Sequence, residues 1–453
     1  MSNFILKTLE TRELKLNTIR LRGFYGGKLW KGSGGGGSGD GFPQLPGDVT
    51  RWHFGGLTNE MMAAMDDPRL EDADGKGRFL SFKNFAWKEG SGISDIYPGA
   101  LVFDGVDDRG TCDNFPILTK EKGYTVVALR QWDQDFLNTT LTGGLLSTRN
   151  YSTGEGVAFE KIESSNKGYW NLGAGGIIDF AKSPFTWQTS KQYNNVGILK
   201  GDKNHGKPLC VGCGLSGGQQ CGRFAIWELV FLDHDATEEE LNKIKDYFVK
   251  TYPWLFPDQA WTVVGKTNED EDRATIANIT GNGNDLVCLN LGFIEGSGYN
   301  EEGEYAGYLV TDGVDDKITS STFEMGNDWT VIGDWGLINT GKKDNAGIVK
   351  FDSIVIYNYN PILINIKNGR NNLIPDQNTV NAICSDGRIY SKDWKESIYN
   401  EETESTSKNL LTIGYSGNNY TKIAFKNLAI YPTVLSKEDC IKAYNYLQTL
   451  KAK

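Results

Sequence analysis

An internal repeat constrains the fold of this chain more than any other feature of the sequence. Four segments occur twice, in the same order and at nearly constant spacing. The clearest reads Leu-Val-Phe-Asp-Gly-Val-Asp-Asp at 101–108 and returns as Leu-Val-Thr-Asp-Gly-Val-Asp-Asp at 309–316. The repeat predicts two copies of one folded unit of about 200 residues. The paired segments are 56–60 with 265–269, 89–92 with 295–298, 101–108 with 309–316, and 124–127 with 329–332.

The composition favours β-structure in both copies. The 453 residues include 55 glycines but only 12 prolines, which suggests many tight turns. The 12 Trp, 20 Tyr and 21 Phe residues suit half-buried strands. A net charge of −11 gives the chain as a whole no basic surface for nucleic acid, so we expect no nucleic-acid partner.

Each copy ends in an alternating strand and a short amphipathic helix. Thr237 with Glu240, and Ser436 with Asp439, have the spacing of helix N-terminal caps. Aromatic and proline residues close the first of these helices, and we place the domain boundary near residue 257. The apolar strand positions are Phe224, Ile226, Leu229 and Phe231 in the first copy, and Ile423, Phe425, Leu428 and Ile430 in the second.

The N-terminal part differs from the rest in charge and composition. Residues 1–30 carry six Lys or Arg and two Glu, a net charge of +4, and 12–22 resemble a half-buried strand. Residues 31–47 are glycine-rich and read as a flexible linker. The predicted organisation is a basic anchoring arm (1–30), a linker (31–47), a first domain (48–257) and a second domain (258–453).

The targeting and redox signals are weak. The sequence shows neither a standard signal peptide nor an apolar membrane span, so we expect no membrane partner. Seven scattered cysteines fit a reducing place of synthesis. We therefore expect synthesis in a cytoplasm.

The two copies resemble concanavalin A-like (laminin-G-like) jelly rolls. The resemblance covers residues 48–453 and rests on the Asp-Gly-Val-Asp-Asp turn after an apolar strand and on the terminal strand, turn and helix. It implies an all-β fold of two tandem antiparallel β-sandwiches, each ending in a short helix and preceded by a strand-like arm. The basic arm, glycine-rich linker and tandem lectin-like domains also resemble fibre or decoration proteins of tailed bacteriophages, including crAss-like phages of Bacteroides.

The repeated turn carries the candidate metal ligands. Its carboxylates are the kind of hard oxygen ligand that Ca²⁺ prefers, and laminin-G-like domains often bind Ca²⁺. Asp-Gly is also the preferred centre of a tight turn, in which the Asp side chain bonds its own backbone, and we favour that role. The candidate residues are Asp104, Asp107, Asp108, Asp312, Asp315 and Asp316.

A second candidate metal site is a group of soft ligands. Cys210, Cys213 and Cys221 lie close together in the sequence, with His205 five residues upstream of the first, and zinc uses such ligands. The spacing is not that of a familiar zinc finger. We favour a glycine-rich loop with buried or idle thiols.

The sequence argues against an enzyme. The three histidines, His53, His205 and His234, all lie in the first copy, so the second has no His-dependent centre of its own. Jelly-roll glycosidases usually carry Glu-x-Asp-x-(x)-Glu along one strand, and no such strand is present. The acidic runs 238–240 and 269–272 read as a first helical turn and a solvated charge run.

Aromatic side chains near loops have two alternative uses. They stack on sugar rings in binding sites, and they more commonly pack in the cores of β-sandwiches. The sequence leaves the choice open. The residues concerned are Trp170, Trp187, Tyr193, Trp394 and Tyr399.

These observations favour a non-enzymatic virion component. The resemblance implies a phage head- or tail-associated fibre or decoration protein, made in the bacterial host cytoplasm and anchored through residues 1–30 to a capsid or tail protein. A strand-like arm needs a pairing partner, so we expect a homo-oligomer, with a trimer favoured by resemblance to phage fibres. The alternative is an adhesin of the phage or bacterium that binds a host surface glycan. A glycan-degrading enzyme is the third hypothesis.

Overall fold

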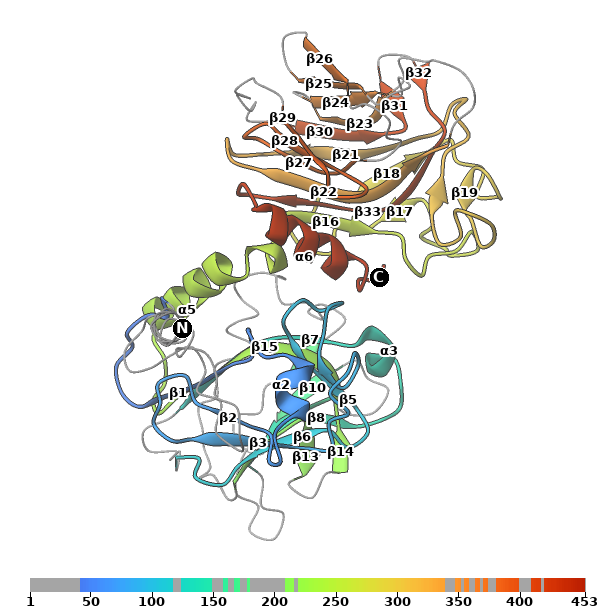
Figure 1. The fold of residues 1–453 in the computed structure, drawn as a ribbon. Helices are drawn as coiled ribbons and strands as arrows, with labels where there is room; N and C mark the ends of the chain where they lie inside the picture. Colours follow the sequence, from blue (N-terminus) through green and yellow to red (C-terminus); the bar gives the residue numbers. More distant parts are fainter. Residues whose placement is uncertain are drawn as a thin grey trace, which may run out of the picture. The chain divides into compact units, whose positions relative to one another are not determined.

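A computed structural model describes residues 41–116, 124–148, 158–161, 167–171, 177–179, 208–215, 219–338, 347–351, 354–357, 363–366, 370–373, 380–398, 409–416 and 419–452. Among these, residues up to 250 form one compact unit, unit 1, and residues from 251 onward form unit 2 (Figure 1). The units meet between residues 250 and 251, a few residues before the boundary that we placed near 257. The predicted arm and most of the predicted linker lie outside the described residues.

The first sheet of unit 1 is built around the long strand β15 (Arg223–Leu232). One side of β15 pairs with β1 (Val49–His53) and β5 (Leu101–Asp104), and the other side pairs with β7 (Thr125–Trp132). The short strand β4 (Gly92–Ile93) pairs with β5. All of these pairings are antiparallel, as predicted.

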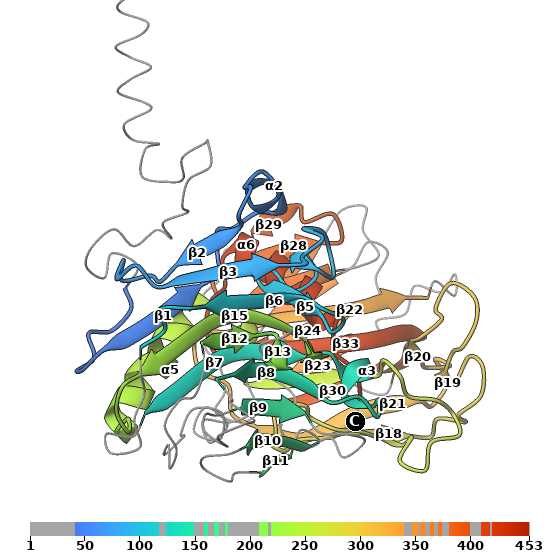
Figure 2. The ribbon, with the colours of Figure 1, turned by 90° about the horizontal axis from the view of Figure 1, so that it is seen from below.

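The second sheet of unit 1 carries the remaining strands. The hairpin of β13 and β14 pairs with the middle strand β8. At one edge of the sheet, β6, β3 and β2 lie side by side (Figure 2). The order is β11 (Ile177–Asp179), β10 (Lys167–Asn171), β9 (Ala158–Lys161), β8 (Gly143–Ser147), β12 (Leu209–Val211), β6 (Arg109–Cys112), β3 (Phe79–Lys83) and β2 (Arg69–Glu71), with β13 (Cys213–Leu215) and β14 (Gln219–Cys221).

Unit 2 repeats this frame. Its central strand β33 takes the place of β15, and β16, β20 and β22 take the places of β1, β5 and β7. The first sheet contains β19 (Gly298–Tyr299), β20 (Leu309–Val310), β33 (Ile423–Tyr431), β22 (Thr330–Leu337), β27 (Val380–Cys384), β28 (Arg388–Ser391), β29 (Glu396–Ile398) and β16 (Gln259–Thr262). The second contains β17 (Thr275–Ile276), β18 (Leu286–Leu289), β21 (Lys317–Phe323), β30 (Asn409–Ile413), β23 (Gly347–Phe351), β24 (Ile354–Tyr357), β25 (Leu363–Ile366) and β26 (Arg370–Leu373), and a separate hairpin is formed by β31 (Tyr415–Ser416) and β32 (Asn419–Tyr420).

An apolar core lies between the two sheets of each unit. In unit 1, Phe82 from the second sheet joins Phe103 and Phe224 from the first. In unit 2, Ile318 from the second sheet joins Phe425 from the first. Side chains from two facing sheets fill one core in this way in a β-sandwich. The predicted fold class, all-β with two tandem sandwiches that each end in a helix, is confirmed.

A bulge explains why the apolar positions of the last strand alternate imperfectly. The register of β15 against β7 shifts between Ile226 and Glu228, and the register of β33 against β22 shifts at Asp334 and Trp335. One extra residue in a strand restores the inward direction of the apolar residues that follow it. The bulge also leaves Glu228 buried beneath a helix, where it accepts a hydrogen bond from Tyr247.

Both predicted terminal helices are confirmed. The Thr237 hydroxyl caps α5 (Glu238–Thr251) by accepting from the Glu240 amide, and the Ser436 hydroxyl caps α6 (Lys437–Leu447) by accepting from the Asp439 amide. After α5, the 3₁₀ turn η2 (Pro253–Leu255) packs on α6 within unit 2. The two remaining described helices are the short α2 (Asn59–Ala63) and α3 (Gln134–Leu137). None of the helices described here is long and apolar enough to cross a membrane.

Candidate functional site

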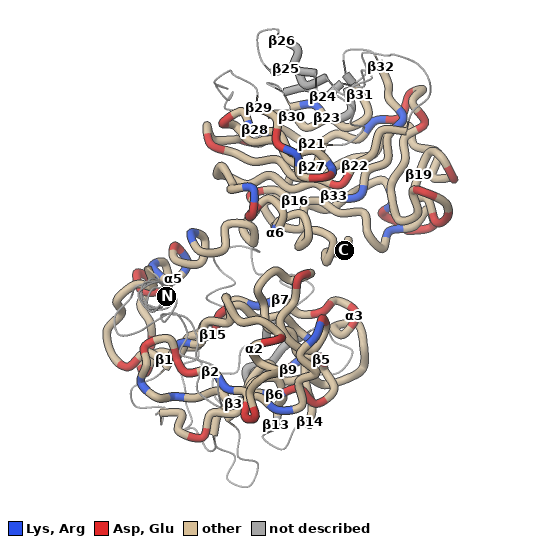
Figure 3. The backbone as a smooth tube through the Cα atoms, viewed as in Figure 1, with Lys and Arg blue, Asp and Glu red and all other residues tan. Residues whose placement is uncertain are grey.

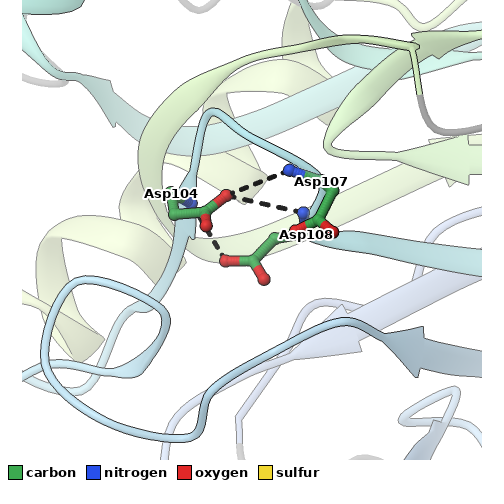
Figure 4. Close-up of side chains that lie close together, drawn as sticks. All are labelled: Asp104, Asp107 and Asp108. Atoms are coloured by element: carbon green, nitrogen blue, oxygen red, sulfur yellow. Dashed lines mark hydrogen bonds between the residues drawn. The ribbon is translucent and has the colours of Figure 1, made fainter.

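The Asp-Gly-Val-Asp-Asp segment forms the same tight turn in both units. In unit 1, Asp104 Oδ1 accepts from the amide of Val106 at 2.7 Å. The same oxygen accepts from the amide of Asp107 at 3.3 Å (Figure 4). Asp108 Oδ2 accepts from the amide of Asp104 at 3.0 Å. The carboxylates therefore hold their own backbone, which is the turn role that the sequence favoured.

Unit 2 reproduces these contacts. Asp312 Oδ1 accepts from the amides of Val314 at 2.7 Å and Asp315 at 3.3 Å, and Asp316 Oδ2 accepts from the amide of Asp312 at 2.7 Å. The glycine of the turn has φ of +78° in both copies, a left-handed conformation that glycine adopts at little cost.

The structure brings together all six predicted metal-binding aspartates, three in each unit. Within each trio, one carboxylate oxygen per residue lies within 4.8 Å of the others. Ca²⁺ needs six to eight oxygens, and in unit 1 two of the carboxylate oxygens, Asp104 Oδ1 and Asp108 Oδ2, already accept backbone amides. Burial raises the pKa of Asp108 to about 7, which opposes the ionised form that a cation needs. The described residues do not by themselves form a calcium shell, and calcium binding stays a prediction.

In each unit, the loop that follows β3 or β18 is hydrogen-bonded to this turn through a serine. In unit 1, the Ser91 hydroxyl donates to Asp108 Oδ1 at 3.1 Å and accepts from the amide of Ala86 at 2.9 Å. In unit 2, the Ser297 hydroxyl donates to Asp316 Oδ2 at 2.8 Å and accepts from a backbone amide at 2.8 Å. The loops 84–92 and 290–298 therefore have the same internal support.

An asparagine near the start of each copy fixes the far side of this loop. Asn59 exchanges two hydrogen bonds with the backbone of Ile93, each 2.8 Å long. Asn268 makes the same pair of 2.8 Å bonds with the backbone of Tyr299. The repeated Thr-Asn-Glu segment is thus a structural clamp in both copies.

The two loops differ at one carboxylate. In unit 1, Glu89 accepts from the Ser94 hydroxyl at 2.6 Å and from the amide of Asp95 at 2.9 Å, which closes the loop. In unit 2, Asn300 closes the loop instead by accepting from the amide of Gly296 at 3.1 Å. The equivalent Glu295 is exposed and makes no hydrogen bond or ion pair with the described residues.

In unit 2, Glu295 lines a pocket of about 560 Å³. Four carboxylates surround the pocket, and acidic segments gather in the loops around β19 (Figure 3). Such an arrangement presents hydrogen-bond acceptors and negative charge to a ligand. The lining residues are Asn268, Glu269, Glu295, Tyr299, Glu301, Glu302 and Gly303.

Sequence reasoning missed this pocket. The run 269–272 was expected to be structural, and for two of its members this is correct: Asp270 accepts from the amide and hydroxyl of Thr267, and Asp272 pairs with Lys266 at 2.8 Å. Glu269 instead lines the pocket. Comparing the two copies offers the missing signal, since serine follows the loop in unit 1 where unit 2 has Asn300.

The cysteine group in unit 1 differs from both sequence hypotheses. Cys213 and Cys221, opposite each other on β13 and β14, form a disulfide, and Cys210 is buried against them. Two of the three proposed zinc-ligand sulfurs are therefore bonded to each other, and a disulfide offers no thiolate to a metal. His205 lies outside the described residues.

The two described histidines contact carboxylates of unit 1. His53 Nδ1 lies 2.6 Å from Glu228 Oε1, and His234 Nε2 lies 3.0 Å from Glu240 Oε1. Glu240 also accepts from the amide of Thr237 and thereby belongs to the cap of α5. These contacts give both histidines a structural role.

Of the aromatic residues considered for sugar stacking, only Trp394 has a described side chain. It is half-buried and packs against Tyr390 and Tyr444. The side chains of the remaining four, Trp170, Trp187, Tyr193 and Tyr399, lie outside the described residues.

Comparison with known proteins gives only distant similarities. No family model and no curated protein sequence matches the chain. A botulinum neurotoxin type G receptor binding domain aligns with 42% of this chain at 12% identity and a TM-score of 0.26, and the chain spans half of that structure. A Trypanosoma rangeli sialidase aligns over 82% of this chain and 72% of its own, at 8% identity and a TM-score of 0.32. A botulinum neurotoxin serotype D ligand binding domain in complex with N-acetylneuraminic acid aligns over 80% of this chain and 94% of its own, at 11% identity and a TM-score of 0.30. These similarities are too weak to carry a conclusion about function.

Proposed function

We propose that the chain is a binding and display protein whose unit 2 recognises carbohydrate in the pocket around Glu295. The observation that carries the proposal is the difference between the two loops. The contacts that hold Glu89 in unit 1 are replaced in unit 2, so Glu295 joins three other carboxylates that make no hydrogen bond within the described residues. Free carboxylates accept hydrogen bonds from sugar hydroxyls, and such charged bonds are stronger than neutral ones.

The charge of the pocket limits the class of sugar. Four carboxylates repel an anionic sugar and favour a neutral or amino sugar. We therefore expect binding to neutral or amino sugars, and weaker binding to sialylated or uronic-acid glycans.

A glycan array with the full chain tests this proposal, followed by titration of the strongest neutral or amino sugar. Glu295→Ala should weaken binding by about tenfold, because one charged hydrogen bond is lost. Glu89→Ala, at the equivalent position of unit 1, is the matched control and should leave affinity unchanged. The proposal fails if no neutral or amino sugar binds, or if the two variants weaken binding equally.

We propose further that the chain does not cleave the glycan. The described histidines, His53 and His234, are held by buried or capping carboxylates in unit 1, and the pocket lies in unit 2. Release of reducing sugar from the bound oligosaccharide is the decisive measurement. Release that disappears in Glu295→Ala would establish the rival hypothesis, a glycan-degrading enzyme that uses the pocket glutamates as acid and base.

The wider role that we propose is a virion fibre or decoration protein of a tailed phage. The net charge of +4 on residues 1–30, ahead of an acidic body, supports an anchor that docks on an acidic capsid or tail protein. Deleting residues 1–30 should leave both units folded and abolish incorporation into particles. Incorporation at normal copy number, or monomers in place of the expected trimers in the intact protein, would contradict this role or its assembly.

A further inference from the structure

His234 lies where three segments of unit 1 come together. It belongs to the loop between β15 and α5, and its Nε2 is 3.0 Å from Oε1 of Glu240 on α5. Its Nδ1 is 3.3 Å from Oδ1 of Asp233, the residue directly after β15. The same Asp233 oxygen accepts from the amide of Asp48 at 2.9 Å, where the chain enters β1. One imidazole ring therefore lies between the entry to β1 and the start of the last helix of unit 1.

The two contacts of the ring differ in what they ask of its protonation. A neutral imidazole has one N–H donor and one acceptor nitrogen, whereas the protonated ring donates from both nitrogens. Ionised carboxylates only accept, so a neutral ring donates to one of Glu240 and Asp233 and turns a lone pair toward the other. Only protonated His234 binds both carboxylates at once.

The surrounding groups favour the protonated ring. Burial opposes its protonation, but the hydrogen bonds to Glu240 and Asp233 outweigh burial and raise the pKa of His234 above its ordinary value. Burial also opposes ionisation of Glu240, but hydrogen bonds from the Thr237 amide and from His234 outweigh it and lower the pKa of Glu240. Glu240 is therefore ionised while His234 titrates. The exposed acidic residues of the same loop and helix turn are Asp235, Glu238 and Glu239.

The charged groups at the entry to β1 have partners of their own. Asp48 Oδ1 lies 2.8 Å from Lys76 Nζ, and the other oxygen of Asp48 contacts Arg78. The backbone of Gly47 passes so close to the ring that a Cβ there would lie 3.0 Å from His234 Nδ1. The side of the ring toward β1 is thus occupied by backbone and by a carboxylate that two cations already neutralise.

Unit 2 has the same loop with a residue that does not titrate. In unit 1, the Thr125 hydroxyl of β7 donates to the carbonyl of His234 at 2.9 Å. In unit 2, the Thr330 hydroxyl of β22 donates in the same way to the carbonyl of Thr433 at 2.9 Å. His234 and Thr433 therefore occupy the same place before the terminal helix. The start of α6 is an internal control for any effect of pH on the start of α5.

We propose that His234 is a pH-sensitive switch that, when protonated, binds Glu240 and Asp233 together and so holds the start of α5 at the entry to β1. Because the pKa of His234 is raised in the folded protein, the switch stabilises unit 1 fully below about pH 6.5, the pKa of an ordinary histidine. Its contribution is lost as pH rises through the higher pKa of the folded state. Since α5 runs into the first residue of unit 2, the hold of unit 1 on the connecting helix depends on pH.

The first test is a titration of the three histidines in the full chain. The rings are labelled with ¹³C and followed by NMR from about pH 5 to about pH 9. The signals are assigned by elimination with His53→Gln, His205→Gln and His234→Gln, and any two of these variants suffice. We expect the midpoint of His234 to lie above pH 6.5. A midpoint at or below that of an ordinary histidine overturns the proposal.

The second test measures the switch at α5 by hydrogen exchange of the full chain. After correction for the intrinsic exchange rate at each pH, protection at the start of α5 should fall roughly tenfold as pH rises through the His234 midpoint, because one charged hydrogen bond is lost. Protection at the start of α6 should stay unchanged. In His234→Gln, an amide replaces the titrating ring, and the fall at α5 should disappear. The proposal is overturned if α5 keeps its protection across the midpoint, or if α5 and α6 lose protection together.

Discussion

Unit 1 and unit 2 build one strand frame around different buried groups. In unit 1, Glu228 on β15 contacts His53 on β1 at 2.6 Å and accepts from Tyr247 of α5 at 3.1 Å, and Arg51 donates to the Tyr247 hydroxyl at 3.0 Å. At the matching positions, unit 2 has the uncharged Asn427, Thr262 and Ala260.

The comparison shows which side-chain contacts the two units share and which differ between them. The turn, the serine tie and the asparagine clamp are the same in both units. The groups beneath the helix and the side chain that closes the loop differ between the units. A shared backbone therefore supports a charged network in one unit and an acidic pocket in the other.

The largest expected effect comes from breaking the charged network. Glu228→Ala leaves Arg51 buried without its carboxylate, and we expect unit 1 to lose about 3–5 kcal/mol of stability. The matched change in unit 2, Asn427→Ala, removes a hydrogen bond to the carbonyl of Leu447 and should cost about 1–2 kcal/mol. Hydrogen exchange of peptides from β15 and β33 in the full chain measures both units separately. Equal losses would mean that the charged network contributes no more to stability than the single hydrogen bond of Asn427.

The next effect tests how alike the two turns are. Gly105→Ala and Gly313→Ala both place a side chain at φ of +78°, and the added carbon would lie 2.9 Å from an atom of Arg223 or Lys422. Each variant should lose about 2 kcal/mol, measured as the midpoint of denaturant unfolding. Gly90→Ala, at φ of +85° with open space around it, is the control and should cost about 1 kcal/mol. Unequal losses at the first two positions would break the equivalence of the turns.

The buried aspartate of each turn predicts a pH dependence. Burial raises the pKa of Asp108 to about 7 and raises that of Asp316. Between pH 4 and pH 7 the unfolded chain has released the Asp108 proton and the folded chain retains it. Stability therefore falls as pH rises through this window, by on the order of 2 kcal/mol. Asp108→Asn should remove this part of the slope in unit 1, measured by denaturant unfolding at a series of pH values. A slope unchanged by the substitution would contradict the shift.

The same variant bears on calcium. A bound Ca²⁺ requires the ionised carboxylate, so it would raise the melting temperature of the parent protein above pH 7 and have no such effect on Asp108→Asn in unit 1. If calcium leaves both melting temperatures unchanged, the turn is the whole role of these aspartates.

The smallest expected effect separates the two loop glutamates. Glu89→Gln replaces a charged acceptor of two hydrogen bonds, and unit 1 should lose about 1 kcal/mol. Glu295→Gln removes no hydrogen bond within the described residues and should leave the stability of unit 2 unchanged. Thermal unfolding of the two variants makes this comparison. Destabilisation by Glu295→Gln would show that its carboxylate supports the loop.

Several local features of the molecule could be read from the sequence. The caps at Thr237 and Ser436, the Asp-Gly turns and the terminal strands were all predicted, because each depends on residues a few positions apart. The repeat itself predicted two copies of one folded unit, and the strands around β15 and β33 repeat in this way. The disulfide between Cys213 and Cys221 was not predicted, because cysteine spacing alone does not specify which sulfurs meet.

The sequence by itself determined that two β-sandwiches follow one another, since alternation, turn glycines and helix caps are short-range signals that repeat with the chain. The tertiary structure alone decided which side chains hydrogen-bond within their own loop and which face a pocket. Glu89 and Glu295 occupy the same place in the same four-residue motif, yet one is held by its neighbours and the other lines a pocket. The meeting of His53 with Glu228 likewise depends on the register of β1 against β15. Folding fixes these long-range contacts through the burial of whole sheets, so no local pattern records them.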